Sequence, residues 1–520
     1  MKKIYALLLL IVTSNLLQAQ TYQVEMVSNL SPNNASNPRW LTVCNGSLYF
    51  FANDGVNGHK IFSVTGNDTP VLCPNIIGAA VFGDGTISTN FPMGVLNNNL
   101  YIPIQAPSIG RELFKYDAVN MPTIVMDINP GNGSSAPTFF TVYNNKLYFQ
   151  ANNPALGTEL WVHDPVALST TCLTDINPGP LSSSISFITV YNNKLYFAGT
   201  NGNDTTAGNT GIELYCYDPA LNAVSLIADI YPGYMGSNPT AIMAANNKLY
   251  FAATDPVYGK ELYEYNDTIV TRLTDVNPGP AQGLYTSDQS FPTFYNGKVY
   301  FCANEPNNDM NLGVYDVTAN TTSIIYCSGA GVSGTPRYFK VWDNKLFFSN
   351  HTDTSGIEIW AADSTGATYQ VWDVHPGIVG GFGNTSYPKF FTPYNGSLYF
   401  NAYNDTSSEE ELFRLYKKAD TVINPNSINE VSKRLNITVA PNPVDDILTL
   451  NLKTTADASF LFEIVDITGR SLIQSDLKYY KKATAGSEII HCSNLAQGNY
   501  ILLLKDENNR VIHTEKVLKK

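Results

Sequence analysis

Charged side chains are scarce in this sequence of 520 residues, in which Asp, Glu, Lys and Arg together make up 14%. Basic residues are the scarcer kind, with 31 Lys and Arg against 44 Asp and Glu and a formal net charge of −13. Between residues 21 and 435, 19 basic groups stand against 34 acidic ones, a net charge of −15. Nucleic acid and anionic membranes need a basic surface, so the sequence argues against both as partners. The acidic excess favours solubility, and affinity for cations or cationic partners is the alternative.

The sequence also lacks paired cysteines and histidines. Its seven cysteines are spread out without a Cys-x-x-Cys pair, and none of the six histidines pairs at metal-ligand spacing. There is no Gly-x-Ser-x-Gly, no His-Glu-x-x-His and no phosphate-binding glycine loop. These absences leave no motif for a disulfide framework, a catalytic metal or a nucleophilic serine, and the cofactor stays unknown.

Long hydrophobic runs are confined to the N-terminus. Lys2 and Lys3 precede an apolar stretch at residues 6–12, which is broken soon afterwards by Thr13, Ser14 and Asn15. This pattern predicts a secretory signal peptide at residues 1–19 rather than a membrane-spanning helix. No later segment is apolar enough to predict a transmembrane span.

One hexapeptide recurs eight times at nearly even spacing. Its fifth residue is aromatic in every copy, and consecutive copies lie 47 to 54 residues apart. The fifth residues are Tyr49, Tyr101, Tyr148, Tyr196, Tyr250, Tyr300, Phe347 and Tyr399. A typical copy, Asn144-Asn-Lys-Leu-Tyr-Phe149, places a tight turn directly before a strand, because Asn-Asn accepts the positive φ angles of a two-residue hairpin.

Two further signals recur within the same period. Gly157-Thr-Glu-Leu-Trp161 has counterparts that keep a glutamate, at Glu112, Glu213, Glu261, Glu358 and Glu411. Because this glutamate is repeated, we expect it to have a structural role, such as bonding a neighbouring strand. The turn Asp175-Ile-Asn-Pro-Gly179 also repeats, and its Asp and Asn are expected to bond their own backbone rather than a calcium ion.

Four short strands per fifty residues are typical of a propeller blade. The sequence therefore predicts an all-β fold with an eight-bladed β-propeller at residues 21–418. A seven-bladed ring is the alternative, because the sixth unit is irregular, and a β-helix is the main rival architecture. The strand expected at residues 22–27 is predicted to complete the last blade, whose own fourth strand is poor.

The repeats resemble those of a family of secreted bacterial proteins with Glu-Leu-Trp and Leu-Tyr-Phe signatures. The resemblance covers residues 22–418. It implies a propeller fold and no settled activity.

After a polar linker at residues 419–435, alternating apolar residues predict a small Ig-like β-sandwich of about seven strands at residues 436–520. Its motif residues are Pro441, Asn442, Pro443, Gly469, Arg470, Gly498, Tyr500, Lys519 and Lys520. Their order resembles the type A C-terminal sorting domain of the type IX secretion system of Bacteroidota. The resemblance implies Sec export, passage through the type IX machinery, removal of this domain, and release or attachment to surface lipopolysaccharide. An ordinary Ig-like accessory domain is the alternative.

Variable loops on a rigid scaffold are where binding usually occurs, and the longer connections of this chain carry several aromatic residues. We therefore take Tyr234, Tyr285, Phe382 and Tyr387 as candidate ligand-binding residues that could stack on sugar rings. The leading hypothesis is a secreted or outer-membrane surface module that binds a glycan or a protein. The rival hypothesis is a glycan-active hydrolase or lyase with carboxylates from different blades. A purely structural surface component is a third reading.

Overall fold

The computed structural model describes residues 22–31, 35–56, 58–74, 93–202, 204–206, 208–287, 289–329, 332–403, 409–417, 435–454, 458–466, 471–475, 478–480, 485–506 and 511–520. The predicted signal peptide and the linker up to residue 434 lie outside these ranges. Residues 1–418 and 419–520 form two compact units, which are described separately. Every regular element in the described ranges is a β-strand, and none of these residues forms a helix that could cross a membrane.

The first unit consists mainly of four-stranded antiparallel sheets, and all but the last are made from consecutive strands. The first four are β2 (Arg39–Cys44), β3 (Ser47–Asn53), β4 (His59–Thr65), β5 (Val71–Leu72); β6 (Gly94–Leu96), β7 (Asn99–Ala106), β8 (Gly110–Tyr116), β9 (Thr123–Met126); β10 (Thr138–Tyr143), β11 (Lys146–Asn153), β12 (Gly157–Asp164), β13 (Ser169–Cys172); and β14 (Ser186–Tyr191), β15 (Lys194–Gly199), β16 (Glu213–Asp218), β17 (Ala223–Ala228).

Three more sheets follow the same order along the chain, and the middle one has an extra strand where the sixth repeat is irregular. They are β18 (Thr240–Ala245), β19 (Lys248–Asp255), β20 (Gly259–Tyr265), β21 (Val270–Arg272); β22 (Leu284–Tyr285), β23 (Thr293–Tyr295), β24 (Lys298–Asn304), β25 (Met310–Asp316), β26 (Thr321–Ile325); and β27 (Arg337–Trp342), β28 (Lys345–Thr352), β29 (Gly356–Ala362), β30 (Thr368–Trp372). A small hairpin, β31 (Ile378–Val379) and β32 (Phe382–Gly383), precedes the last sheet.

The last sheet joins the two ends of the first unit. It contains β33 (Lys389–Tyr394), β34 (Ser397–Tyr403) and β35 (Glu410–Lys417), with β1 (Tyr22–Ser28) as its fourth strand. Strands β1 and β35 pair antiparallel, with Tyr22 opposite Lys417 and Val24 opposite Leu415. The pairing expected for the N-terminal strand is therefore present, and it covers an edge of β35 that would otherwise be open.

Each hairpin follows the chemistry of the repeated hexapeptide. Asn144 and Asn145 have φ angles of 47° and 56°, which the turn between β10 and β11 requires. Leu147 and Phe149 then become fully buried. Complete burial of a side chain of this size stabilises the fold by roughly 1.5–3 kcal/mol. Both faces of the second strands are buried, since every sheet is covered by a neighbour on each side.

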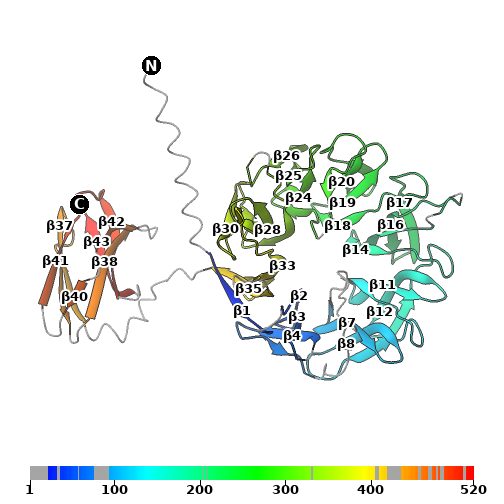
Figure 1. Ribbon diagram of the computed structural model, residues 1–520, viewed down its shortest axis with the longest axis horizontal. Helices are drawn as coiled ribbons and strands as arrows, with labels where there is room; N and C mark the ends of the chain where they lie inside the picture. Colours follow the sequence, from blue (N-terminus) through cyan, green and yellow to red (C-terminus); the bar gives the residue numbers. More distant parts are fainter. Residues whose placement is uncertain are drawn as a thin grey trace, which may run out of the picture. The chain divides into compact units, whose positions relative to one another are not determined.

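Neighbouring sheets share hydrophobic clusters all the way around the first unit. Leu147 and Phe149 of β11 pack with Leu96 and Tyr101 of the preceding sheet. The last sheet packs on the first in the same way, through clusters that contain Tyr399 and Phe50. Figure 1 shows the sheets around a common centre, with β2, β14, β18 and β33 on the inner side. The arrangement is a closed, propeller-like ring.

The alternating strand direction gives the ring two faces. The Asn-Asn and Asn-Gly turns lie between the first and second strands, on what we call the turn face. The turns between second and third strands, and the connections between sheets, lie on the opposite loop face. We call the first strand of each sheet the inner strand, because first strands of neighbouring sheets contact one another. We call the start of the inner strands, on the loop face, the inner rim.

The second unit has two sheets around one core. The strands are β36 (Leu435–Ala440), β37 (Ile447–Thr454), β38 (Ala458–Asp466), β39 (Ser471–Gln474), β40 (Lys478–Tyr480), β41 (Ala485–His491), β42 (Gly498–Asp506) and β43 (Val511–Lys519). One sheet contains β36, β37 and β41, and the other contains the remaining strands. Leu448 and Leu450 of the first sheet pack against Ile464 and Leu502 of the second.

Candidate functional site

The repeated glutamate of the third strand bonds several sheets to the sheet that follows. Glu213 of β16 is fully buried and accepts hydrogen bonds from the backbone N–H groups of Ile230 (3.1 Å), Tyr231 (3.1 Å) and Ser237 (2.7 Å). The Ser237 hydroxyl also donates to it, at 2.5 Å. Ser237 lies in the segment that leads into β18 of the next sheet. The glutamate therefore bonds the neighbouring sheet, which supports the structural role expected from its recurrence.

The same glutamate–serine contact occurs at five junctions between sheets. The pairs are Glu112–Ser135, Glu159–Ser183, Glu213–Ser237, Glu358–Ser386 and Glu411–Ser36. Glu261 accepts a hydrogen bond from Thr274, as Glu159 does from Thr174, but Gly283 stands at the serine position and supplies no hydroxyl. In the irregular sheet the glutamate is replaced by Asn311.

Burial perturbs these carboxyl groups. Desolvation raises the pKa of Glu213, Glu261 and Glu411 to about 7, against the opposing effect of the hydrogen bonds that each accepts. It raises the pKa of Glu358 to about 8. Carboxyl groups with a perturbed pKa can indicate an active site. All six repeated glutamates, however, are fully buried and bonded to backbone and hydroxyl donors. They hold the ring together and do not form a catalytic pair.

The glycine of the Gly-x-Glu motif is required because the backbone of the following connection passes very close to it. Gly110 has a φ of +70°, and a Cβ there would lie 1.5 Å from the carbonyl oxygen of Gly133. Gly157 and Gly259 meet the backbone of the next connection in the same way. The glycine lets the following loop pass closely over the third strand, where the glutamate can reach it.

The inner rim carries aromatic residues in an unusual backbone conformation. The second residue of five inner strands, at a β-bulge, is Trp40, Phe139, Phe187, Tyr338 or Phe390, with φ between 54° and 58°. Ala241 occupies the same position on β18, with a φ of 54°. Left-handed backbone at a bulky residue costs about 1–3 kcal/mol and is concentrated at functional sites. A bulge also redirects the side chain, so the rings of this set face one another.

These rings contact one another from sheet to sheet. The Phe390 ring lies 5.4 Å from the Trp40 ring and 5.8 Å from the Tyr338 ring, between centroids. Phe187 lies 5.3 Å from Phe139 and 5.5 Å from Phe291 of the irregular sheet. All six rings are partly exposed. The inner rim thus offers two arcs of aromatic surface on the loop face.

Cations precede three of these aromatic residues. Arg337, Lys389 and Arg39 begin β27, β33 and β2, which belong to three successive sheets. Lys389 pairs with Glu410 at 2.5 Å. Although burial alone would raise the pKa of Glu410, its pKa is lowered by the Lys389 ammonium, a hydrogen bond from Asn401 and Arg39. The other inner strands with a described first residue at this register have Thr138, Ser186 and Thr240.

Two of the four candidate loop aromatics lie beside these cations. The Arg337 guanidinium is 5.5 Å from the Tyr285 ring centroid, and the Lys389 ammonium is 5.7 Å from that of Tyr387. Tyr234 is 45% exposed in the connection before β18. Phe382 is 64% exposed in the hairpin of β31 and β32, beside exposed Ile378 and Val379. The structure therefore brings Tyr285 and Tyr387 to the basic part of the rim and leaves Tyr234 and Phe382 on separate loops.

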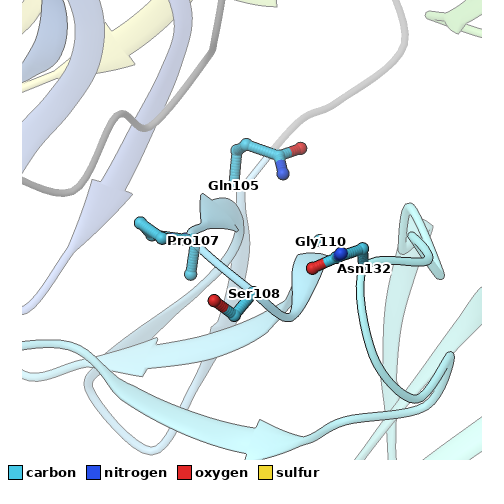
Figure 2. Close-up of a pocket in the computed structure, with 6 residues that line it drawn as sticks. Gln105, Pro107, Ser108, Gly110 and Asn132 are labelled. Carbon is cyan, nitrogen blue, oxygen red and sulfur yellow. The ribbon is translucent and has the colours of Figure 1, made fainter.

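A shallow pocket of about 320 Å³ lies elsewhere on the loop face. Figure 2 shows Gln105, Ser108 and Asn132 around the turn between β7 and β8. Its volume is at the lower end of those that hold small ligands, and its lining has no charged side chain. It offers amide and hydroxyl groups only.

The described residues contain no group of three or more His, Cys, Asp or Glu side chains that could hold a metal ion. The repeated Asp-x-Asn-Pro-Gly turn uses its oxygens locally: the backbone N–H of Gly179 donates to Asp175, and the amide of Asn177 donates to the carbonyl of Ser182. The cysteines are free, and five of them are buried.

In the second unit, the Pro-Asn-Pro motif is bonded to the C-terminal strand. The Asn442 amide donates to the carbonyl of Lys516, and its oxygen accepts from the N–H of Leu518 at 2.9 Å. The backbone N–H of Val444 donates to Leu518, and that of Lys520 donates to Val444. Asn442, with Pro441 and Pro443 on either side, therefore attaches the start of the unit to its last strand.

The remaining motif residues are partly described. The Tyr500 hydroxyl donates to the carbonyl of Ala496 at 2.7 Å, next to Gly498, where β42 begins. Lys519 is buried and donates to the carbonyl of Asp445. Gly469 and Arg470 lie outside the described residues.

Residues 438–520 match the family model of the secretion system C-terminal sorting domain. The match confirms the predicted sorting domain and indicates type IX export, to the cell surface or beyond it. The match does not extend into the ring.

Comparisons with other proteins add no sequence relative for the ring. A search of curated proteins finds no match to this chain. Among solved structures, puromycin hydrolase aligns with a TM-score of 0.44 and 11% identity over 72% of this chain and 61% of that one. A puromycin-hydrolyzing peptidase of Mycobacterium tuberculosis aligns with a TM-score of 0.44 and 10% identity, over 73% and 60%. This chain thus spans about three fifths of the length of either structure.

Sequence reasoning missed the inner rim. A signal was nevertheless present, since Pro38-Arg-Trp40, Pro336-Arg-Tyr338 and Pro388-Lys-Phe390 occupy equivalent places in three repeats. Because these repeats are separated by up to 350 residues along the chain, only closure of the ring makes them neighbours.

Proposed function

We propose that this protein is an exported glycan-binding module. In this proposal the sheets of the first unit are the eight blades of a β-propeller at residues 21–418. The second unit, residues 436–520, is an Ig-like sandwich that directs type IX secretion after Sec export. The observation that carries the binding function is the partly exposed aromatic inner rim at positive φ.

The left-handed backbone of the inner rim costs conformational free energy, and this cost supports a binding role. Five inner strands hold a bulky aromatic in left-handed backbone, although glycine would fit there without strain. An aromatic ring gives a large, flat contact area with the apolar face of a sugar and loses little entropy on binding. The positions of the rings on the loop face, where connections vary in length, also favour recognition.

The candidate loop residues extend this surface in the proposal. Tyr285 and Tyr387 flank the basic part of the rim through their contacts with Arg337 and Lys389. Tyr234 and Phe382 would contact a longer glycan or a surface protein that spreads over the loop face. A glycan is the favoured ligand, because rings that alternate with hydrogen-bonding cations suit a molecule with both apolar faces and polar groups.

A glycan array with the protein that retains both units tests this function. We expect defined oligosaccharides to bind, and a Trp40→Ala/Phe390→Ala double variant to lose that binding. Tyr326→Ala is the control, because it removes an exposed aromatic next to the outer strand β26. A blank array, or equal loss in both variants, contradicts the proposal. Release of shortened products from bound glycans would instead favour the hydrolase or lyase.

A further inference from the structure

Five inner strands carry threonine at one register, whereas β6 and β18 have the uncharged Gly94 and Met243 there and β27 has a lysine. On β10, β14 and β33 this position is Thr141, Thr189 or Thr392, and each hydroxyl donates to a carbonyl of the adjacent inner strand. Thr42 and Thr293 occupy the same register on β2 and β23. On β27 the residue at this register, opposite Phe347, is Lys340.

Lys340 is a cation without a carboxylate partner among the described residues. Its side chain is exposed to solvent, and it makes no ion pair or hydrogen bond with the parts of the chain that the structure describes. Desolvation by the neighbouring strands lowers the pKa of its ammonium group. Lys340 is therefore an accessible ammonium group that no described carboxylate neutralises, and it is available to an anionic ligand.

Three further cations begin inner strands of the same three sheets. Arg337 begins the strand that carries Lys340, and Lys389 and Arg39 begin the next two inner strands. Glu410 neutralises Lys389 through the 2.5 Å ion pair. Arg39 has no ion pair within the described ranges and acts on Glu410 and His59 only at longer range. This sector is therefore basic, in a first unit whose net charge is strongly negative.

Aromatic rings alternate with these cations. Tyr338, Phe390 and Trp40 follow the three cations and contact one another in sequence. Guanidinium groups bind carboxylates through two parallel hydrogen bonds, and ammonium groups bind them as point charges. A sugar ring that carries a carboxylate has the two kinds of surface that this sector provides.

We propose that the rim sector of β27, β33 and β2 binds an acidic glycan through the carboxylate of a uronic acid residue, with Lys340 as its specificity-determining cation. This inference rests on the proposed glycan-binding function and names its ligand class. The acidic remainder of the ring repels a long polyanion, so the sector accepts one or a few uronic acid residues. Nucleic acid is disfavoured for the same reason.

The test compares acidic sugars with their neutral counterparts. Three acidic oligosaccharides are used: one of galacturonate, one of mannuronate, and one in which glucuronate alternates with N-acetylglucosamine. Each is compared with its carboxyl-reduced form. Calorimetry with the full-length protein gives the dissociation constants. We expect at least one acidic member to bind tenfold or more tightly than its reduced partner, and Lys340→Thr to remove that difference.

Lys340→Thr is suited to this test, because threonine already occupies the same register on five other inner strands. Its fold is checked by thermal unfolding. Lys146→Thr is the matched control, since Lys146 pairs with Asp164 on the turn face and its loss changes the net charge equally. It is expected to leave acidic and neutral binding unchanged.

The possible outcomes separate this inference from the proposed function. If acidic and reduced forms bind equally, the uronate inference is overturned and glycan binding stands. If no glycan binds, both fail. An equal loss in Lys340→Thr and Lys146→Thr would mean that net charge, rather than this sector, attracts the ligand, and a stronger preference for sulfated analogues would overturn the carboxylate class.

Discussion

Ser36, near the start of the first unit, donates a hydrogen bond to Glu411, near its end. The Ser36 hydroxyl lies 2.5 Å from Oε2 of Glu411, and the Ser36 backbone N–H lies 3.3 Å from Oε1. Both residues are fully buried. The contact that joins four other sheets to the sheet that follows therefore also joins the last sheet to the first, so one local motif serves internal junctions and the closure.

Removal of this hydroxyl should destabilise the ring. We expect Ser36→Ala to lower the free energy of unfolding by about 1–3 kcal/mol, because a buried carboxylate loses one of its donors. Urea-induced unfolding of the full-length protein measures the change. Ser323→Ala on the exposed part of β26 is the control and should change stability by less than about 0.5 kcal/mol. An equal effect of the two variants would contradict a role for the contact in closure.

The buried glutamates should make stability depend on pH. Their pKa values of about 7 or 8 in the folded protein lie above the ordinary 4.5, so the fold favours the protonated form. Their contribution is complete below about pH 4.5 and is lost as the pH rises through 7 to 8. We expect the melting temperature of the ring to fall between pH 5 and pH 8.

Glu358→Gln tests the origin of this dependence. Glu358 has the most strongly raised pKa of the group, so its replacement by a neutral amide should make the decline with pH shallower. Asp68→Asn, which removes an exposed carboxyl, is the control for the loss of charge alone. If the decline is identical in Glu358→Gln and the unmodified protein, the buried carboxyls are not its cause.

Much of the first unit could be predicted from sequence because its information is local and repeated. Asn144 and Asn145 specify a hairpin by their own backbone preferences, and Glu213 shows its structural role by recurring in other repeats. The inner rim could not be predicted in this way. Trp40 and Phe390 are neighbours only because the chain ends meet, and their positive φ follows from a bulge that no residue type specifies.

The candidate site was therefore only partly found. The aromatic-loop criterion selected Tyr285 and Tyr387, which lie beside cations, and their part in ligand binding stays a prediction. The criterion could not separate them from Tyr234 and Phe382, because exposure and distance to the rim depend on how the connections fold. Lys340 was overlooked because a single lysine within a strand has no motif, and its departure from threonine is visible only after the strands are aligned by register.

Closure by β1 gives a prediction about assembly. Deletion of residues 22–28 should leave β35 with an unpaired edge and remove the Glu25–Arg414 ion pair. Because open edges recruit other strands, we expect a lower melting temperature and a concentration-dependent oligomer in light scattering. A synthetic peptide of sequence Tyr-Gln-Val-Glu-Met-Val-Ser should restore the monomer, and a scrambled peptide should not. A stable monomer without the strand would contradict this account.

The attachment of Asn442 to β43 predicts an effect on the sorting domain. Asn442→Ala removes both side-chain hydrogen bonds to the last strand, so the Leu518 backbone N–H loses its acceptor. We expect faster hydrogen exchange along β43 and a smaller exported fraction in the bacterium that produces the protein, because the sorting domain ends on this strand. Asn451→Ala is the control, because Asn451 is exposed on β37 and makes only a 3.5 Å contact with Thr438. Normal export with accelerated exchange would show that Asn442 stabilises the unit without being needed for sorting.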